Sequence, residues 1–197
     1  MELYAIKING WENPLGFDYG VPRCSWKVRG NTGSRQEAAR ISVGLDETLQ
    51  KVVFQKEGNL NSLGEALDFP LKPYTRYWYT VTVRTEHGEE AVSQPCFFET
   101  GKLDDPWKGQ WLGVEDGDTH PEFQKTFSLP DKPCSARLYI CGLGLFEAYL
   151  NGEKAGNDLL APFLNDYTEH FQYCTYDVTS LLAQDNTLSV LLGDGWY

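Results

Sequence analysis

The sequence lacks the hydrophobic periodicity of helices. No segment of its 197 residues repeats apolar side chains at positions i, i+3, i+4 and i+7 for more than two turns. Instead, 14% of the residues are aromatic, and there are 19 glycines and 10 prolines, as is typical of short strands joined by tight turns. A hydrophobic fraction of 41% supports a substantial core. We therefore expect an all-β protein with one large or two small domains.

Cysteine is sparse and shows no pairing pattern. The chain has five cysteines, an odd number, and they show neither CxxC spacing nor the density of a disulfide scaffold. We interpret them as reduced thiols. The first residues lack the basic start and long apolar stretch of a signal peptide, and no run of about twenty apolar residues occurs. These absences favour a cytoplasmic protein.

Basic residues are scarce in the second half of the chain. The formal net charge is −11, and residues 1–101 carry 11 basic and 13 acidic residues, whereas residues 102–197 carry 6 and 15. Nucleic acids and anionic membranes both require a basic surface, so the composition argues against either as a partner. It is compatible with a neutral ligand.

Sequence signatures of catalysis are also missing. The three histidines (His87, His120 and His170) have no zinc-ligand spacing, and there is no Gly-rich phosphate loop or Gly-x-Ser-x-Gly elbow. Residues 115–118, Glu-Asp-Gly-Asp, resemble a calcium loop only in composition, because the other spaced ligands are absent. We expect an exposed acidic turn there.

Alternating apolar residues predict strands over most of residues 136–197, with every second side chain on one buried face. Asn151-Gly152 predicts a hairpin turn, because both residues tolerate positive φ. We expect Asp177 to cap a single helical turn and Asp185-Asn186 to form another turn. The expected inward positions are Ala136, Leu138 and Ile140; Phe146, Ala148 and Leu150; alternate residues of 170–178; and Leu188, Val190 and Leu192.

The first hundred residues carry their own strand pattern. The corner Leu71-x-Pro73-x-Thr75-x-Tyr77, together with Trp26, resembles the fibronectin type III family, in which Leu and Tyr plug the end of a two-sheet sandwich. The resemblance covers about half the chain and implies no activity. The inward positions that we expect are Cys24, Trp26 and Val28; Ala39, Ile41, Val43 and Leu45; and Tyr77, Tyr79, Val81 and Val83.

These patterns divide the chain into three regions. We expect a fibronectin type III-like domain over residues 1–101, a joint rich in Trp and Asp over 102–122, and an antiparallel, jelly-roll-like sandwich over 123–197. The second sandwich is expected to be truncated, because the strand pattern is interrupted at Gly-Asp-Gly-Trp-Tyr. Trp107 and Trp111 either pin the two domains together or fill the edge of the nearest core.

The second region resembles the N-terminal sandwich of bacterial α-L-rhamnosidases of glycoside hydrolase family 78. The matching stretches are Ala136-Arg-Leu-Tyr-Ile-Cys-Gly-Leu-Gly144, Tyr149-Leu-Asn-Gly152, Leu160-Ala-Pro162, Asp166-Tyr167, Tyr173-Cys-Thr-Tyr-Asp-Val-Thr179 and Leu192-Gly-Asp-Gly-Trp-Tyr197. Those enzymes also carry a preceding fibronectin-like module that ends in Phe-x-Thr-Gly, here Phe98 to Gly101. Phe163-Leu164 replaces a common Gly-Trp pair.

The resemblance implies a non-catalytic accessory fragment that recognises substrate or supports the catalytic domain. In that family an inverting hydrolysis of terminal α-L-rhamnose takes place in a downstream (α/α)6 barrel, with two carboxylates about 6.5–9.5 Å apart. No catalytic residue is carried over to this chain. The expected partners are therefore that barrel and a rhamnose-containing glycan.

Polar residues after the hairpin are the candidate glycan site. Asn157 and Asp158 offer oxygens to a calcium ion or to sugar hydroxyls, as related rhamnose-binding sandwiches do, and Asn165 and Asp166 are similar candidates. Trp196 offers a stacking face, although Trp196 and Tyr197 also fit core positions. Ordinary turn chemistry is the alternative for the polar residues. No cofactor is expected other than a calcium ion at Asn157 and Asp158.

Two other functions fit parts of the sequence. A sugar-binding sandwich of a β-galactosidase-like hydrolase also uses an Asn-Gly hairpin, an Asp-Val-Thr turn and an Asn-Thr-Leu strand. A tandem interaction protein built on the fibronectin-like module would repeat the Leu-x-Pro-x-Thr-x-Tyr corner, which residues 102–197 do not contain. The closing Gly-Asp-Gly-Trp-Tyr and the order of the domains favour the rhamnosidase.

Overall fold

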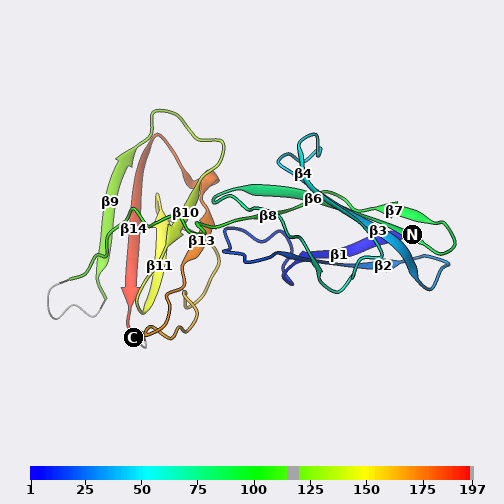
Figure 1. Cartoon of the computed structure of the whole chain (residues 1–197). Coiled ribbons are helices and arrows are strands. Elements are labelled where there is room, and N and C mark those ends of the chain that lie inside the picture. Colours follow the sequence, from blue (N-terminus) through cyan, green and yellow to red (C-terminus); the bar gives the residue numbers. More distant parts are fainter. Residues whose placement is uncertain (115–119, 196–197) are drawn as a thin grey trace. The chain divides into compact units, whose positions relative to one another are not determined.

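A computed structural model describes residues 1–114 and 120–195 and divides the chain into two compact units, Met1–Pro106 and Trp107–Tyr197. Strands dominate both units, and the described residues contain no α-helix (Figure 1). All strand pairs within the named sheets are antiparallel, so the predicted all-β fold is confirmed. The acidic turn predicted at residues 115–118, and Trp196 and Tyr197, lie outside the described residues.

The first unit contains two sheets. Strands β1, β2 and β5 form one, and strands β4, β3, β6 and β7 form the other, in which β8 also pairs with β6. The strands are β1 (Glu2–Ile8), β2 (Arg23–Arg29), β3 (Gln36–Gly44), β4 (Val52–Gly58), β5 (Glu65–Ala66), β6 (Arg76–Thr85), β7 (Glu90–Val92) and β8 (Cys96–Glu99).

The core of the first unit follows the predicted alternation. The inward positions predicted in β2, β3 and β6 are buried except Val28, which is partly buried, and Phe98 of β8 stacks on Tyr77 with ring centroids 5.2 Å apart. At the predicted corner, the backbone N–H of Lys72 donates to the Tyr77 hydroxyl at 2.9 Å, which closes the end of the sandwich. Leu45 was predicted to face inward, which is wrong: β3 ends at Gly44, and Leu45 is exposed.

The second unit contains a four-stranded sheet in the order β12, β11, β14, β9 and a two-stranded sheet of β10 and β13. Figure 1 shows β14 between β9 and β11. The elements are β9 (Glu122–Ser128), β10 (Arg137–Ile140), β11 (Leu145–Leu150), β12 (Glu153–Lys154), β13 (Cys174–Asp177), the 3-10 turn η1 (Thr179–Leu181) and β14 (Asp185–Gly193).

Two asparagines join the β11–β12 hairpin to the start of β14. Asn151 and Gly152 both have positive φ and form the predicted turn. The Asn151 side-chain amide donates to Asn186 Oδ1 at 2.9 Å, and Asn151 Oδ1 accepts the Thr187 backbone N–H at 2.8 Å. Asn186 is buried and also accepts the Ala183 N–H. The turn predicted at Asp185-Asn186 is therefore wrong, since both residues begin β14.

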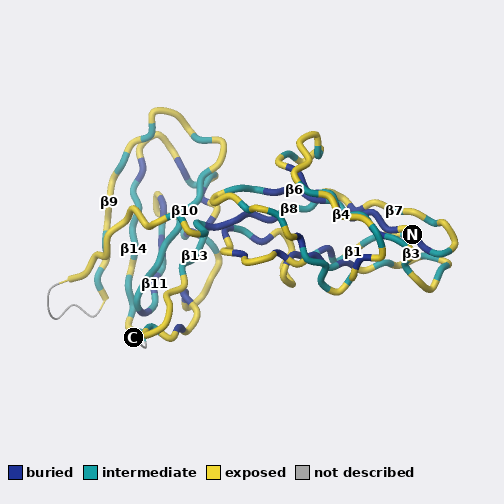
Figure 2. The backbone as a smooth tube through the Cα atoms, in the orientation of Figure 1, coloured by how far each residue is buried: buried dark blue, intermediate teal, exposed yellow. Residues whose placement is uncertain are grey.

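The core of the second unit is only partly enclosed. Phe146, Ala148 and Leu150 of β11 are buried as predicted, whereas the inward residues of β10 and β14 are packed against them but remain half-buried. Figure 2 shows this difference as dark blue along β6 of the first unit and mainly teal along β14. On the edge strand β9, Lys125 pairs with the inward-facing Leu188 and so shares its side of the sheet, but the Lys125 side chain is exposed.

The strand predicted over residues 170–178 is shorter than expected. Strand β13 begins at Cys174, because its partner β10 ends at Ile140, directly before Cys141 and Gly142. The predicted helical turn is present as η1, and the Asp177 carboxylate accepts the Thr179 backbone N–H at 3.0 Å. Leu182, which follows η1, is buried in the core.

Candidate functional site

The first candidate pair, Asn157 and Asp158, follows the β11–β12 hairpin. Gly156 has a φ of 78°, and a Cβ at this position would collide with the Tyr176 ring, so a glycine is needed to let the chain cross that ring. Asn157 and Asp158 are exposed. Burial is the main cause that raises the pKa of Tyr176, and hydrogen bonding to Cys174 and Asp158 adds to it. Asp158 therefore offers carboxylate oxygens beside a protonated phenol.

The second candidate pair, Asn165 and Asp166, has a structural role in its loop. Asn165 is buried, and its side-chain amide donates to the Phe163 carbonyl at 2.9 Å. Its Oδ1 atom accepts no hydrogen bond in the described structure. Asp166 is exposed and accepts the hydroxyl and the N–H of Thr168, which lowers the pKa of its carboxyl group. The Asp166 side chain is therefore ionised and engaged in a turn.

The structure does not join these predicted residues into one site. Within residues 1–114 and 120–195, no hydrogen bond or ion pair connects Asn157 or Asp158 to Asn165 or Asp166. Trp196 lies outside the described residues. Binding of sugar or calcium at these positions remains a prediction.

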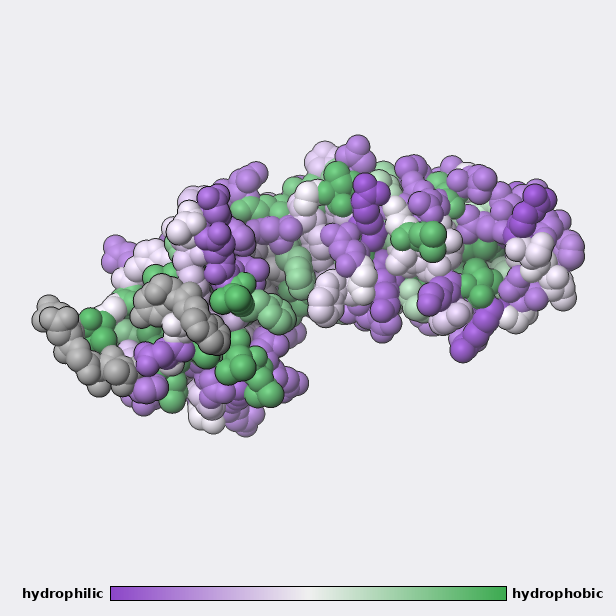
Figure 3. All heavy atoms as spheres, turned by 90° about the horizontal axis from the view of Figure 1, so that it is seen from below, coloured by the Kyte–Doolittle hydropathy of each residue, from purple (hydrophilic) through white to green (hydrophobic). Residues whose placement is uncertain are grey.

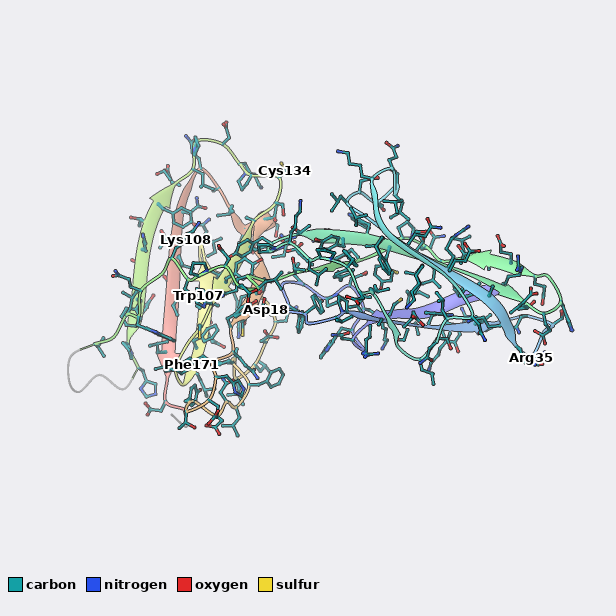
Figure 4. The ribbon with its side chains drawn as sticks, in the orientation of Figure 1. Asp18, Arg35, Trp107, Lys108, Cys134 and Phe171 are labelled. Atoms are coloured by element: carbon teal, nitrogen blue, oxygen red, sulfur yellow. The ribbon has the colours of Figure 1, made fainter. Side chains whose placement is uncertain are left out.

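Aromatic side chains that the sequence did not assign to the site gather in the second unit. Trp107 meets Tyr173 edge-on with centroids 5.6 Å apart, and Trp111 meets Phe171 in the same way at 5.8 Å. Figure 4 labels Trp107 and Phe171, which come from the segments before β9 and β13. Trp111 and Phe171 are both more than half exposed. In the sequence, Phe171 and Tyr173 alternate with a polar residue, and this alternation was the only signal that could have indicated the aromatic cluster.

A groove of about 430 Å³ opens beside Trp111. Its walls are mainly apolar, and Asp194 is the only charged side chain among the described residues that line it. The apolar walls include Trp111, Leu112, Phe123, Ile140, Val190 and Leu192. The volume is in the range of small-molecule sites.

The carboxyl groups with clearly altered pKa values are poor proton donors. Backbone N–H groups of Ser34 and Arg35 hydrogen-bond to Glu86 and lower its pKa to about 2. Hydrogen bonds from Lys154 and Tyr149 lower the pKa of Glu147. A general acid needs a raised pKa. The lowered pKa values of Glu86 and Glu147 instead favour the ionised carboxylate, which accepts hydrogen bonds.

Two negative findings apply to the described residues. They contain no group of three or more His, Cys, Asp or Glu side chains that could hold a metal ion. They also contain no helix that is long and apolar enough to cross a membrane.

Two protein families match the chain. Residues 3–104 match the Rha78A-like, N-terminal immunoglobulin domain, and residues 131–197 match the alpha-L-rhamnosidase N-terminal domain. The two matches fall on either side of the division at Pro106 and Trp107.

Relatives that match nearly the whole of this chain are considerably longer. An alpha-L-rhamnosidase of Formosa agariphila is 28% identical over 233 residues, which cover 100% of this chain and 24% of the relative. The structure of an alpha-L-rhamnosidase from Dictyoglumus thermophilum has a TM-score of 0.88 and 30% identity, covering 98% of this chain and 25% of that one. The crystal structure of an alfa-L-rhamnosidase from Aspergillus terreus has a TM-score of 0.83 and 29% identity, covering 100% of this chain and 24% of that one. The chain thus spans about a quarter of these proteins.

Proposed function

Because the chain belongs to the Rha78A-like, N-terminal immunoglobulin domain family, we propose that it is the non-catalytic N-terminal region of an α-L-rhamnosidase. The observation that carries this proposal is that both units align with the N-terminal domains of rhamnosidases while covering about a quarter of their length. Hydrolysis of terminal α-L-rhamnose is assigned to the remainder of such a polypeptide, and we propose an inverting (α/α)6 barrel there. The β-galactosidase-like and interaction-module alternatives have no comparable support.

An activity assay tests whether this region is non-catalytic and the rest of the polypeptide carries the hydrolytic activity. The 197-residue chain and the complete reading frame that contains it are each incubated with an aryl α-L-rhamnoside. We expect release of the aryl group only by the complete polypeptide, because this chain spans only about a quarter of the rhamnosidases that it matches. Turnover by the 197-residue chain, or none by the complete polypeptide, would contradict the proposal.

We also propose a weak glycan-binding role for the second unit. It is supported by the exposed Asp158 carboxylate beside Tyr176 and by the exposed rings of Trp111 and Phe171, which offer a polar contact and an apolar face. Asn157, Asn165, Asp166 and Trp196 stay candidates for the same ligand, and Asn157 and Asp158 for calcium. A cytoplasmic location is proposed from the free cysteines.

Titration calorimetry with L-rhamnose, with and without calcium, tests the binding role. The wild-type chain should release heat, and Asp158→Ala and Trp111→Ala should each reduce the affinity. Ser180→Ala, an exposed position away from both side chains in the sequence, is the control. No heat from the wild type under either condition would leave a supporting role only.

A further inference from the structure

One short segment of the second unit exposes an unusual amount of apolar surface. Leu159, Leu160, Phe163 and Leu164 are 83%, 74%, 82% and 73% exposed, and we call them the apolar loop. Single exposed apolar residues are ordinary, but four large ones within six positions mark an interaction surface. In Figure 3, apolar side chains gather on the face of this unit that is at the bottom of Figure 1.

The apolar loop is anchored to the core of its unit. The Ala161 carbonyl accepts the Phe146 backbone N–H at 2.8 Å, and Ala161 and Pro162 are buried between the exposed pairs. Asn165 holds the Phe163 carbonyl from the other side. Leu160 has a φ of 56°, a conformation that leucine keeps only where its surroundings impose it. The exposed side chains therefore stay at the surface because the backbone on both sides is fixed.

The charges around the apolar loop restrict what can cover it. Asp158, Asp166 and Glu169 flank it, and the sequence contains no Lys or Arg after Lys154. A second copy that pairs through this same loop would bring the same acids face to face, and an anionic membrane would repel them. A fitting surface is apolar at its centre and carries Lys or Arg at its margin.

We propose that the apolar loop docks onto the polypeptide that follows this region in the parent α-L-rhamnosidase, with Leu159 and Phe163 as the main anchors. This inference rests on the proposed function. The Formosa agariphila relative, of which this chain covers 24%, provides about three times as much further polypeptide as a source of that surface. Docking onto it makes the apolar loop an internal contact and explains why a stable loop exposes four large side chains.

Photo-crosslinking in the complete polypeptide tests the contact. Benzoylphenylalanine is placed at position 163, and the cross-linked peptides are identified by mass spectrometry. We expect cross-links to peptides that follow residue 197. Position 63 is the matched control, because Leu63 is 88% exposed in the first unit and should give no such cross-link. Cross-links from position 163 only to residues 1–197, only to a second copy, or to nothing would overturn the proposal.

A thermal comparison separates docking from folding. In the 197-residue chain, Leu159→Ser combined with Phe163→Ser should leave the Tm unchanged, because both side chains are already solvated. In the complete polypeptide the same double variant should lower the Tm. An unchanged Tm there would overturn the docking proposal. Intact rhamnosidase activity in the same sample would show that the proposed function survives that failure.

Discussion

The two units bury their inward-facing side chains to different extents. In the first unit, Ile41, Val43, Val81 and Phe98 are completely enclosed between two sheets. In the second unit, Val190 occupies a central strand as Val81 does, yet it lines an open groove. The facing sheet has three strands in the first unit and two in the second, so the same alternation of apolar residues yields a closed core only where the facing sheet is broad enough to cover it. Most of the predicted differences between the units follow from that cover.

The largest expected effect comes from the best-covered ring. Phe98→Ala should destabilise the first unit by about 3–5 kcal/mol, because it removes a fully buried ring and leaves a cavity. Urea unfolding followed by aromatic fluorescence measures the loss. Phe163→Ala in the 197-residue chain is the matched control and should change stability by less than about 0.5 kcal/mol. Equal losses of stability in Phe98→Ala and Phe163→Ala would contradict the difference in burial between the two units.

A smaller effect separates the two central valines. Val81→Ala should cost about 2 kcal/mol, and Val190→Ala roughly half as much, because Val190 keeps part of its surface in water. The shift of each unit's urea midpoint measures this. If Val190→Ala costs as much as Val81→Ala, the groove is covered in solution and the contrast is wrong.

A third pair compares two tyrosine hydroxyls. Tyr77→Phe should cost about 1 kcal/mol, since the Lys72 N–H loses its acceptor at a closed corner. Tyr149→Phe removes a surface hydrogen bond to Glu147 and should be nearly neutral. The Tm of each variant checks the order, and the reverse order would show that the corner does not stabilise the first unit.

The smallest effect is a dependence on pH. The pKa of Glu86 falls from its ordinary value of 4.5 to about 2 in the folded state, so the unfolded chain binds the proton first. The stabilisation is therefore complete above about pH 4.5 and is lost as the pH falls towards 2. Glu86→Gln should therefore make the stability of the first unit depend less on pH in this range.

A matched variant places the pH effect in one unit. Hydrogen bonds from Lys154 and Tyr149 lower the pKa of Glu147. Glu147→Gln should therefore change the loss of stability at low pH in the second unit only. The free energy of unfolding of each unit, measured as a function of pH for both variants, tests this. An identical change in both units after either substitution would mean that the carboxylates act through overall charge.

Much of the fold was predictable because its signals are local. The alternation in β6 and β11, the Asn151-Gly152 turn and the Tyr77 corner each depend on neighbouring residues. The length of β13 was not predictable, because it depends on where a distant partner strand ends. The buried role of Asn186 was missed for the same reason, since its partner Asn151 is 35 positions away.

The candidate site was less predictable than the fold. Asn165 and Asp166 look like polar loop residues in the sequence, but the structure uses them to hold Phe163 and Thr168. The pairing of Trp111 with Phe171 depends on a contact across 60 positions, which spacing alone does not reveal. The exposure of the apolar loop was equally hidden, because four large apolar residues in sequence favour a buried segment.

The placement of Lys125 limits how the four-stranded sheet can grow. Among the described strands β9 pairs only with β14, and a further strand beside β9 would set its own side chains next to the exposed, charged Lys125, which disfavours such pairing. Lys125 is therefore expected to disfavour edge-to-edge association of this sheet with other chains. Lys125→Val is expected to make the β9 edge more prone to such association.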